Sequence, residues 1–583
     1  LYPALVFAAP LALESATMMT VFAILSVTCL FNLWYVLHTL NTVVFMDTRD
    51  GLAMAASAVN LVALTLAVYF GLTALEPGED REPAVMPFLD RIRIFAATTA
   101  SRSLPQSTII EKEIAPPAWT RIDGLVLAAM IAAALVTRFR HLGYPAEIVF
   151  DEVHFVAQAR QYLHAEWFLD PHPPLAKLVI AGGIWMFGDH PWSWRVGNAT
   201  LGTVLVGVTY LLGRRVTGSR LAATLAAAFI VCDGLFLVDS RTAVIDIVYV
   251  TFAAIAYLLL FRFLQTPGLL ERRRILPWLG LALGLCVGSK LYIPVITVLL
   301  VVGFLVYALA WKTKTLGRLL DRRVVAAVML VGSVAFAAFI AVFLPHFILG
   351  WWGGMGDLFH YYLHEVPDYE RAVAEATHPY SSPWWSWPLM LRPVAYWQNF
   401  PKTGPVATVW GGGNPLLWWG ALTAITITAV QALERPSLSR SFLVLGYLGY
   451  LMMWIWIGRT LFIYHYMGSL YLGYLALAWL IAQCWEGNSE LWEHLSLLMT
   501  MAPAFILGLG GWWGGAGLLA VFTGYAAMLI RTRHAGRYVA AVFVLAALVL
   551  FIYYWPVWVG ISIDRSGYYA RMWLEGEGLR SWI

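Results

Sequence analysis

The chain has 583 residues, of which 60% are apolar and only 12% are charged, and its mean hydropathy is +0.70. This composition excludes a water-soluble globular protein, whose surface needs far more charged side chains. The formal net charge of +4 gives no sign of a nucleic-acid partner. We therefore expect an all-α polytopic membrane protein.

Apolar runs close to the roughly 20 residues of a membrane-spanning helix recur along most of the sequence. About fifteen spans are predicted, at residues 15–40, 52–75, 122–138, 199–213, 220–238, 244–264, 277–311 (two short passes), 324–345, 415–433, 441–457, 464–484, 494–509, 514–530 and 538–560.

Basic residues concentrate in four short loops, and such loops face the cytoplasm in most membrane proteins. If the spans alternate from there, the segments 139–198, 346–414 and 458–463 lie outside the cytoplasm. The basic residues are Arg214, Arg215 and Arg220; Arg272, Arg273 and Arg274; Lys312, Lys314, Arg318, Arg322 and Arg323; and Arg531, Arg533 and Arg537.

One polar stretch stands out in this apolar sequence: Asp151 and Glu152 are adjacent acids, and His172 and Lys177 follow them. Charged groups at the mouth of a membrane bundle are costly to desolvate, so they mark a site of chemistry or of transport. We interpret the stretch as a site of chemistry on the extracytoplasmic side.

Apolar residues recur at helical spacing after Asp151 and predict an amphipathic helix in the membrane interface. Asp151 then occupies the N-cap, where backbone N–H groups and the helix dipole hold a carboxylate ionised. A cap with no further role is the alternative. A second helix, from Pro174 to about Phe187, is too short to span the bilayer and is expected in the interface as well.

Arg195 follows this second helix and is a candidate for binding a phosphate, because a guanidinium group offers a planar fork of donors. The alternative is an arginine that reaches to the interface from the end of a span.

Neither a metal nor another cofactor is expected. The four cysteines fall inside apolar runs, where a thiol behaves as a small apolar group. His154, His164 and His172, taken with Asp151, match no familiar metal-ligand spacing.

A series of motifs follows in chain order between residues 120 and 565, and together they resemble the protein O-mannosyltransferase family, whose members are polytopic enzymes with the glycosyltransferase C-type fold. The motifs are Phe150-Asp-Glu-Val-His-Phe155, Asp170-Pro-His-Pro-Pro-Leu-Ala-Lys177, Asp239-Ser-Arg-Thr-Ala-Val-Ile-Asp246, Gly280-Leu-Ala-Leu-Gly-Leu-Cys-Val-Gly-Ser-Lys290, His378-Pro-Tyr-Ser-Ser-Pro-Trp-Trp-Ser-Trp387, Arg392-Pro-Val394, Gly413-Asn-Pro-Leu-Leu-Trp-Trp419 and Arg459-Thr-Leu-Phe-Ile-Tyr-His-Tyr466. The outer loop over 346–414 is too short for the β-trefoil insertion of eukaryotic members, so the chain is most similar to bacterial ones.

The resemblance implies transfer of mannose from a polyprenyl-phosphate-mannose donor to Ser or Thr hydroxyls of translocated polypeptides, with inversion at the anomeric carbon. It implies an enzyme of the plasma membrane that meets membrane lipid and the protein-translocation machinery. Asp151 would be the general base and Glu152 would support substrate binding, with stabilisation of the helix dipole as the alternative for Glu152.

Substrate-binding candidates follow from the same resemblance. Arg195, Lys177 and then Tyr464 with His465 are expected to stabilise the leaving phosphate, and His172 joins them as a binding residue. Arg241 and Asp246 are further candidates. An internal ion pair between Arg241 and Asp246 is the alternative for these two.

The family resemblance also divides the chain. We expect an N-terminal transmembrane extension with a linker over 1–115, a catalytic transmembrane half over 116–350, an outer loop over 351–414 and C-terminal transmembrane helices over 415–583. Residues 1–7 are faintly similar to the tail of another lipid-dependent glycosyltransferase module, which would make this chain the back half of a longer protein.

Two other functions remain open at this point. A relative with the same fold would glycosylate a lipid or a cell-wall glycan, as aminoarabinose and arabinose transferases do. A transporter would explain the many spans and the charges Asp246 and Lys290, but no internal repeat with matching interrupted helices is found in the sequence.

Overall fold

The computed structural model describes residues 118–311, 322–532, 534–574 and 581–583. The expected extension over 1–115 with its two spans lies outside the described residues, and so do Lys312, Lys314, Arg318 and Arg533.

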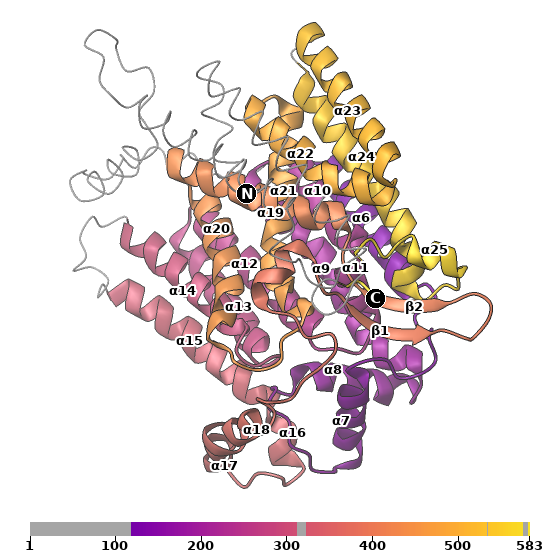
Figure 1. Cartoon of the computed structure of the whole chain (residues 1–583). Helices are drawn as coiled ribbons and strands as arrows, with labels where there is room; N and C mark the ends of the chain where they lie inside the picture. Colours follow the sequence, from indigo (N-terminus) through magenta and orange to yellow (C-terminus); the bar gives the residue numbers. More distant parts are fainter. Residues whose placement is uncertain (1–117, 312–321, 533, 575–580) are drawn as a thin grey trace. The chain divides into compact units, whose positions relative to one another are not determined.

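Within the described residues, ten helices are long and apolar enough to cross a membrane, or eleven if one bent pair is counted as a span. The expectation of an all-α polytopic membrane protein is therefore confirmed (Figure 1). The ten are α6 (Arg121–Phe139), α9 (Pro191–Thr217), α12 (Asp246–Gln265), α15 (Arg322–Val342), α19 (Pro415–Glu434), α20 (Leu438–Met452), α21 (Met467–Glu486), α22 (Leu491–Gly508), α23 (Gly511–Arg531) and α24 (Ala535–Val559).

The bent pair is α10 (Arg220–Cys232) and α11 (Gly234–Arg241), which meet at 60°. Asp233 stands at the break and its side chain accepts a hydrogen bond from the Phe236 N–H, so it caps α11. The residue after it is Gly234, where a Cβ would collide with the indole of Trp558. The predicted span over 220–238 is thus a broken one, and α13 (Leu269–Val287) and α14 (Pro294–Trp311) occupy the predicted pair of short passes.

The short basic loop between α9 and α10, which is predicted to face the cytoplasm, lies at one end of the bundle. The Arg215 guanidinium donates to Gln265 at the end of α12 (2.7 Å), and Ser219 donates to Glu486 at the end of α21 (2.8 Å). Since α12 begins at Asp246 and α21 follows His465, these two residues lie at the opposite end.

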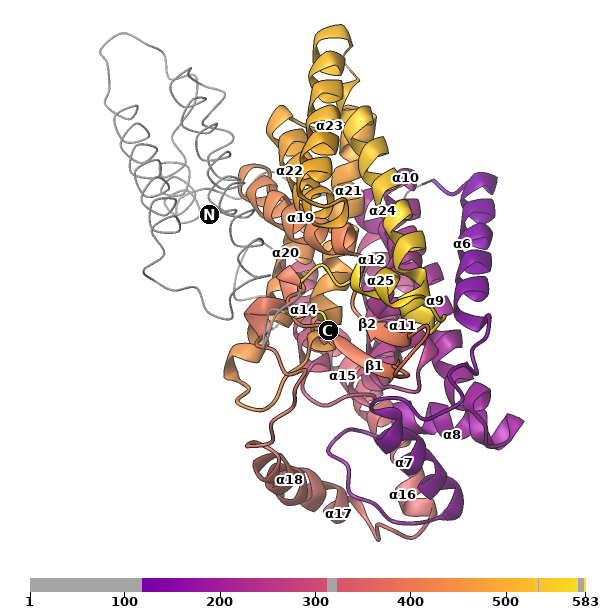
Figure 2. The ribbon, with the colours of Figure 1, turned by 45° about the vertical axis from the view of Figure 1, so that its right-hand side comes forward.

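The segments between spans at that opposite end carry short helices and a β-hairpin (Figures 1 and 2). Both predicted interfacial helices are present, as α7 (Glu152–His164) and α8 (Leu175–Phe187). The remaining elements there are α16 (Leu344–Ile348), α17 (Met355–His360), η2 (Tyr361–Glu365), α18 (Val366–Ala372), η3 (Trp384–Leu389), β1 (Val394–Asn399), β2 (Ala407–Gly411), η4 (Met453–Trp456), η5 (Ile463–Tyr466) and α25 (Arg565–Tyr569).

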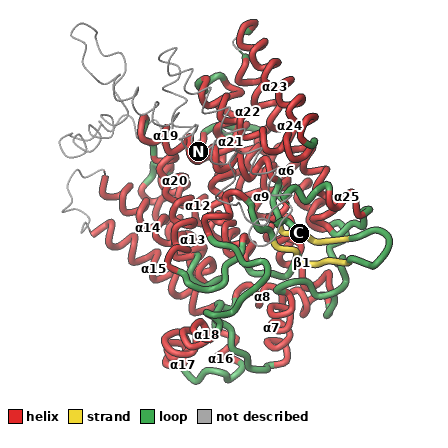
Figure 3. Tube along the Cα trace, in the orientation of Figure 1, coloured by secondary structure: helices red, strands yellow, loops and turns green. Residues whose placement is uncertain are grey.

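The outer loop contains a β-hairpin, which the prediction of an all-α fold did not include (Figure 3). Strands β1 and β2 pair antiparallel from Val394 opposite Gly411 to Asn399 opposite Ala407, with a bulge between Ala395 and Trp397. All five residues of β2 are buried, which anchors the outer loop on the bundle.

Helix α21 runs through the interior of the bundle. Of the residues in its membrane-spanning part, 89% are buried, compared with only 17% for α6. The turn η5 that precedes α21 is therefore held firmly, and it carries Tyr464 and His465 to the end of the bundle where the acidic loop lies.

Candidate active site

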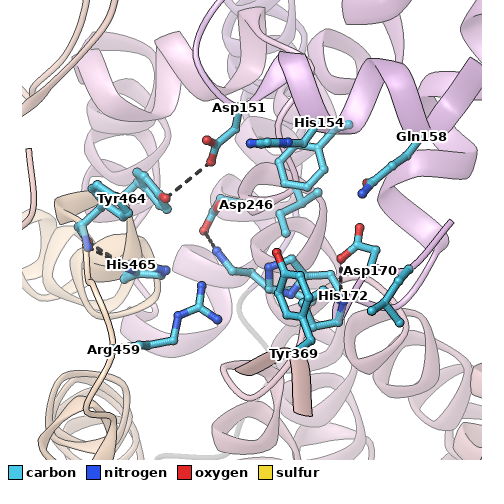
Figure 4. A pocket seen from close by; sticks show the side chains of 16 residues that line it. Asp151, His154, Gln158, Asp170, His172, Asp246, Tyr369, Arg459, Tyr464 and His465 are labelled. Atoms are coloured by element: carbon cyan, nitrogen blue, oxygen red, sulfur yellow. Dashed lines mark hydrogen bonds and ion pairs between the residues drawn. The ribbon is translucent and has the colours of Figure 1, made fainter. Parts of the chain in front are cut away.

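A cavity of about 220 Å³ opens where the start of α7, the start of α12, the loop after α13 and the segment before α21 meet (Figure 4). Its lining is rich in groups that carry or exchange protons. They are the acids Asp151, Asp170 and Asp246, the cations Lys290 and Arg459, the histidines His154, His172 and His465, and the tyrosines Tyr369 and Tyr464.

Asp151 occupies the predicted N-cap position of α7, but its side chain makes no capping hydrogen bond. The carboxylate lines the cavity instead, where the Tyr464 hydroxyl donates to Oδ2 over a long 3.5 Å (Figure 4). Burial raises the pKa of Asp151 to about 6, against an opposing effect of His154. The expectation that backbone N–H groups hold this carboxylate is wrong, because its side chain accepts no capping hydrogen bond.

Glu152 points the other way and is fully buried. Its two carboxylate oxygens accept hydrogen bonds from the Arg195 guanidinium at 2.7 and 2.8 Å, and from the backbone N–H groups of Val149 (3.0 Å) and Ala243 (2.8 Å). Stabilisation of the helix dipole, the alternative role for Glu152, therefore does not describe all of its interactions, because Glu152 also pairs with Arg195 from another helix.

Arg195 is also fully buried and does not line the cavity. Besides Glu152, it donates to the backbone carbonyl groups of Leu142, Pro145 and Glu147. The guanidinium thus ties the chain just before Asp151 to α9, and its donors are already engaged.

Of the residues in the segment 170–177, some line the cavity and others bind only to the protein itself. Lys177 is buried, and its ammonium donates to Asp170 and to the His172 carbonyl, each at 2.6 Å. Burial opposes ionisation of Asp170, yet the adjacent Lys177 holds the pKa of Asp170 below its usual value. Asp170 and His172 line the cavity and Lys177 does not.

His172 is neutral, because burial lowers the pKa of its imidazole to about 3. Its Nδ1 atom is buried and has no hydrogen-bond partner among the described residues. A polar ring atom of this kind at a cavity wall is suited to a ligand hydroxyl.

Arg241 and Asp246 do not pair with each other, so the alternative of an ion pair between them is wrong. Asp246 pairs with the Lys290 ammonium at 2.6 Å, and both line the cavity. Arg241 donates to four backbone carbonyl groups at the end of α6, from Thr137, Arg138, Arg140 and His141. Arg241 therefore closes the C-terminus of α6.

Tyr464 and His465 line the cavity, as expected for substrate-binding candidates. The sequence interpretation did not assign a role to Arg459, whose guanidinium Nη1 atom donates to both carboxylate oxygens of Glu370 at 2.6 and 2.8 Å. The sequence does carry a signal for both cations of the cavity. Arg459 stands directly before an apolar run and Lys290 stands inside one, and a charge in such a place marks a candidate functional residue.

A second cavity, of about 620 Å³, shares Arg459 with the first. Apolar side chains line much of it, from Trp384 of η3 to Trp454, Ile457 and Leu461. Trp456 beside it is 87% exposed. The described residues contain no group of three or more His, Cys, Asp or Glu side chains placed to hold a metal ion.

The described helices have the architecture of the glycosyltransferase C-type fold. A solved structure of the Saccharomyces cerevisiae protein O-mannosyltransferase Pmt1-Pmt2 complex, bound to the sugar donor, is similar to 80% of this chain and 94% of that chain, with a TM-score of 0.63 at 15% sequence identity. The predicted fold is therefore confirmed.

Two models of one family match the sequence. The model described as dolichyl-phosphate-mannose-protein mannosyltransferase matches residues 128–194 and 188–350, and the C-terminal four TMM region of protein-O-mannosyltransferase matches residues 358–577. The chain therefore belongs to the protein O-mannosyltransferase family, and it is a mannosyltransferase.

Bacterial relatives agree. A polyprenol-phosphate-mannose–protein mannosyltransferase of Mycolicibacterium smegmatis (strain MKD8) is 28% identical over 425 residues, which cover 61% of this chain and 81% of the relative. The enzyme of the same name from Mycobacterium tuberculosis (strain ATCC 25618 / H37Rv) is 24% identical over 521 residues, 78% of this chain and 92% of the relative. The resemblance to bacterial members is thus confirmed.

Proposed function

We propose that this mannosyltransferase moves mannose from a polyprenyl-phosphate-mannose donor to Ser or Thr hydroxyl groups of polypeptides, with Asp151 as the general base. One observation carries the assignment. The two other acids that line the cavity are each held by a cation, Asp170 by Lys177 and Asp246 by Lys290, and so are Glu152, by Arg195, and Glu370, by Arg459. Asp151 has no ion pair among the described residues.

The reaction needs one base and no general acid. A polyprenyl phosphate leaves as a stable anion, in contrast to the sugar alcohol that leaves in glycoside hydrolysis and requires a second carboxyl group. Asp151 takes the proton of the acceptor hydroxyl as the oxygen attacks the anomeric carbon, a role worth about 10²- to 10⁴-fold. A pKa of about 6 leaves the carboxylate ionised at neutral pH and more basic than an ordinary aspartate.

Arg459 and Lys290 are the cations placed to receive the phosphate. Arg459 engages Glu370 through Nη1 alone, and its Nε and Nη2 atoms have no hydrogen bond within the described part of the chain. A guanidinium edge of this kind matches a phosphate. Tyr464 and His465 complete that side of the cavity.

Other candidates take supporting roles. Arg195, Lys177 and Arg241 direct their donors at acids and carbonyl groups of the protein, so we assign them to positioning the acidic loop. The unpartnered Nδ1 atom of His172 is assigned to a hydroxyl of the mannose ring.

The polyprenyl chain of the donor fits the second cavity. Arg459, where the phosphate would sit, lines this cavity together with the apolar side chains of Trp454, Ile455 and Ile457. A lipid tail gains free energy by burying its methylene and methyl groups against such a surface, while the acceptor polypeptide approaches Asp151 from the other side.

The remaining assignments concern the whole chain. We place the protein in the plasma membrane, surrounded by membrane lipid, with the cavity on the extracytoplasmic side; support comes from Arg215 and its basic neighbours at the opposite end of the bundle.

Residues 116–350 form the catalytic half, 351–414 the outer loop and 415–583 the C-terminal helices, with 1–115 as an extension. Acceptors then arrive as unfolded chains from the translocation machinery.

A transfer assay tests the proposal. Membranes that contain the protein are incubated with labelled polyprenyl-phosphate-mannose and a Ser/Thr-rich peptide. Label in the peptide, removed by β-elimination, is the expected result. Label that enters only lipid or glycan would contradict the proposal and favour a transferase that acts on a lipid or a cell-wall glycan.

A further inference from the structure

The backbone immediately before Asp151 has an unusual conformation. Phe150 has a φ of +43°, in the left-handed region that side chains other than glycine rarely adopt. Such a conformation persists only where the surroundings enforce it, and it is most frequent at functional sites.

The surroundings of Phe150 are a box of four aromatic rings from distant parts of the chain. Its ring stacks on Tyr396 of β1 with centroids 4.7 Å apart, and meets the rings of Tyr464, Phe462 and His378 edge to face at 5.9, 6.2 and 6.4 Å. Contacts of this geometry add to the free energy of burial. Tyr396 is itself fixed, because its hydroxyl donates to Asp239 of α11 at 2.7 Å.

The residues on either side of Phe150 are also tied down. The Val149 N–H donates to Glu152, and Glu152 is held by Arg195. In contrast, the carboxylate of Asp151 has a single long contact, to Tyr464 at 3.5 Å. The direction in which this carboxylate points is therefore set by the backbone at position 150 more than by hydrogen bonds of its own.

We propose that Phe150 is a positioning residue: its ring, held in the box of Tyr396, Tyr464, Phe462 and His378, locks the left-handed turn that aims the Asp151 carboxylate into the cavity. This inference rests on the proposed role of Asp151 as the base. The box joins β1 of the outer loop to the segment before α21, so the base is aligned only when both are docked.

The test compares Phe150→Ala with Phe168→Ala in the purified full-length protein. Phe168 is a suitable control, because it is also partly buried, packs on the rings of Tyr162 and Trp351, and does not itself line the cavity. We expect Phe150→Ala to lower kcat by about 10- to 100-fold, since misplacing a reacting group by about 1 Å costs up to 10²-fold. The KM for the donor stays within about twofold, because the phosphate and lipid sites do not include Phe150.

Two further measurements separate positioning from a general loss of structure. Phe150→Tyr keeps the ring and should restore kcat, and the pH at which kcat is half-maximal should move in Phe150→Ala and not in Phe168→Ala. If Phe150→Ala does not fold, Phe150→Leu replaces it, because leucine keeps apolar volume but lacks the flat ring. The same loss of kcat is then expected for Phe150→Leu. A kcat of Phe150→Ala or Phe150→Leu equal to that of Phe168→Ala overturns the inference.

Asp151→Asn is assayed alongside. If Asp151→Asn is inactive and Phe150→Ala is fully active, the positioning role of Phe150 is rejected and the role of Asp151 as the base is kept. Turnover by Asp151→Asn at the wild-type rate rejects the proposed base itself.

Discussion

Glu152 and Arg195 form a fully buried, two-pronged ion pair, with Nε–Oε1 and Nη2–Oε2 distances of 2.7 and 2.8 Å. The adjacent Asp151 faces the cavity without an ion pair among the described residues. Two neighbouring acids therefore differ in their surroundings: Glu152 is engaged by Arg195, and Asp151 lines the cavity.

Breaking the Glu152–Arg195 pair should destabilise the fold. Arg195→Lys loses the planar fork and its carbonyl contacts, and leaves part of a buried carboxylate unsatisfied, which typically costs about 3–5 kcal/mol. A clearly lower melting temperature in detergent is the expected result. Arg160→Lys is the matched control, because its two-pronged pair with Asp189 is 35% and 44% exposed and such pairs contribute about 0–1 kcal/mol. Equal melting temperatures for the two variants would contradict the account.

Removing the proposed phosphate cation should weaken use of the donor. A hydrogen bond to a charged group is worth about 1.5–3 kcal/mol, so Arg459→Gln should lower kcat/KM for the donor about 10- to 100-fold. Steady-state assays at varied donor concentration measure this. Arg371→Gln is the control, since Arg371 is 78% exposed and pairs only with Asp368 in the described structure; a similar loss in both variants would remove Arg459 from the site.

Several of these features were predictable from the sequence. Apolar run length identifies the spans, and helical periodicity identifies α7 and α8, because both signals are local. The hairpin was missed although β-branched and aromatic residues on both sides of Pro401–Pro405 favour strands. A short strand pair is easily overlooked in a chain of apolar helices.

The partner of each charge was not predictable, because the pairs are formed by residues far apart in sequence. Glu152 and Arg195 are separated by 43 positions, Asp246 and Lys290 by 44, and Glu370 and Arg459 by 89. Only the fold shows that Arg195 is occupied and that Arg459 has unused donors. The capping prediction for Asp151 failed because the backbone of this residue is itself helical (φ −67°, ψ −7°), whereas a capping residue has a non-helical backbone.

Turnover should depend on pH through Asp151. The base must be ionised, and its pKa in the protein without substrate is raised from 3.8 to about 6; kcat/KM should therefore be constant above pH 7 and fall as pH drops through 6. A pH profile of kcat/KM measures this midpoint. A profile that stays flat down to pH 4.5 would contradict the raised pKa.

Stability should show the opposite trend. A carboxyl group with a raised pKa in the folded state adds stability that is complete below the unfolded pKa of 3.8 and is lost as pH rises through about 6. Asp151→Asn, which cannot ionise, should thus melt at a higher temperature than the wild type at pH 7.5, with the difference shrinking towards pH 4. Melting curves of both proteins at several pH values provide the check.

The orientation of the bundle can be tested with single cysteines. Gln398 of β1 and Thr532 after α23 are both exposed, and they lie in the outer loop and in a basic loop respectively. A maleimide that does not cross membranes should label Gln398→Cys on intact cells, and Thr532→Cys only after permeabilisation. The native Cys232, Cys286 and Cys484 are buried, and Cys29, which lies outside the described residues, is replaced by Ser in both variants. The reverse labelling pattern would place the cavity in the cytoplasm.

The most direct test of the central claim is the rate of mannose transfer by Asp151→Asn, measured with labelled polyprenyl-phosphate-mannose and a Ser/Thr-rich peptide. The substitution keeps the shape of the side chain and removes its basicity. We predict that turnover falls by about 10²- to 10⁴-fold while the amount of folded protein and donor binding are kept. Unchanged turnover would contradict the assignment of Asp151 as the base, and loss of folded protein would assign it a structural role.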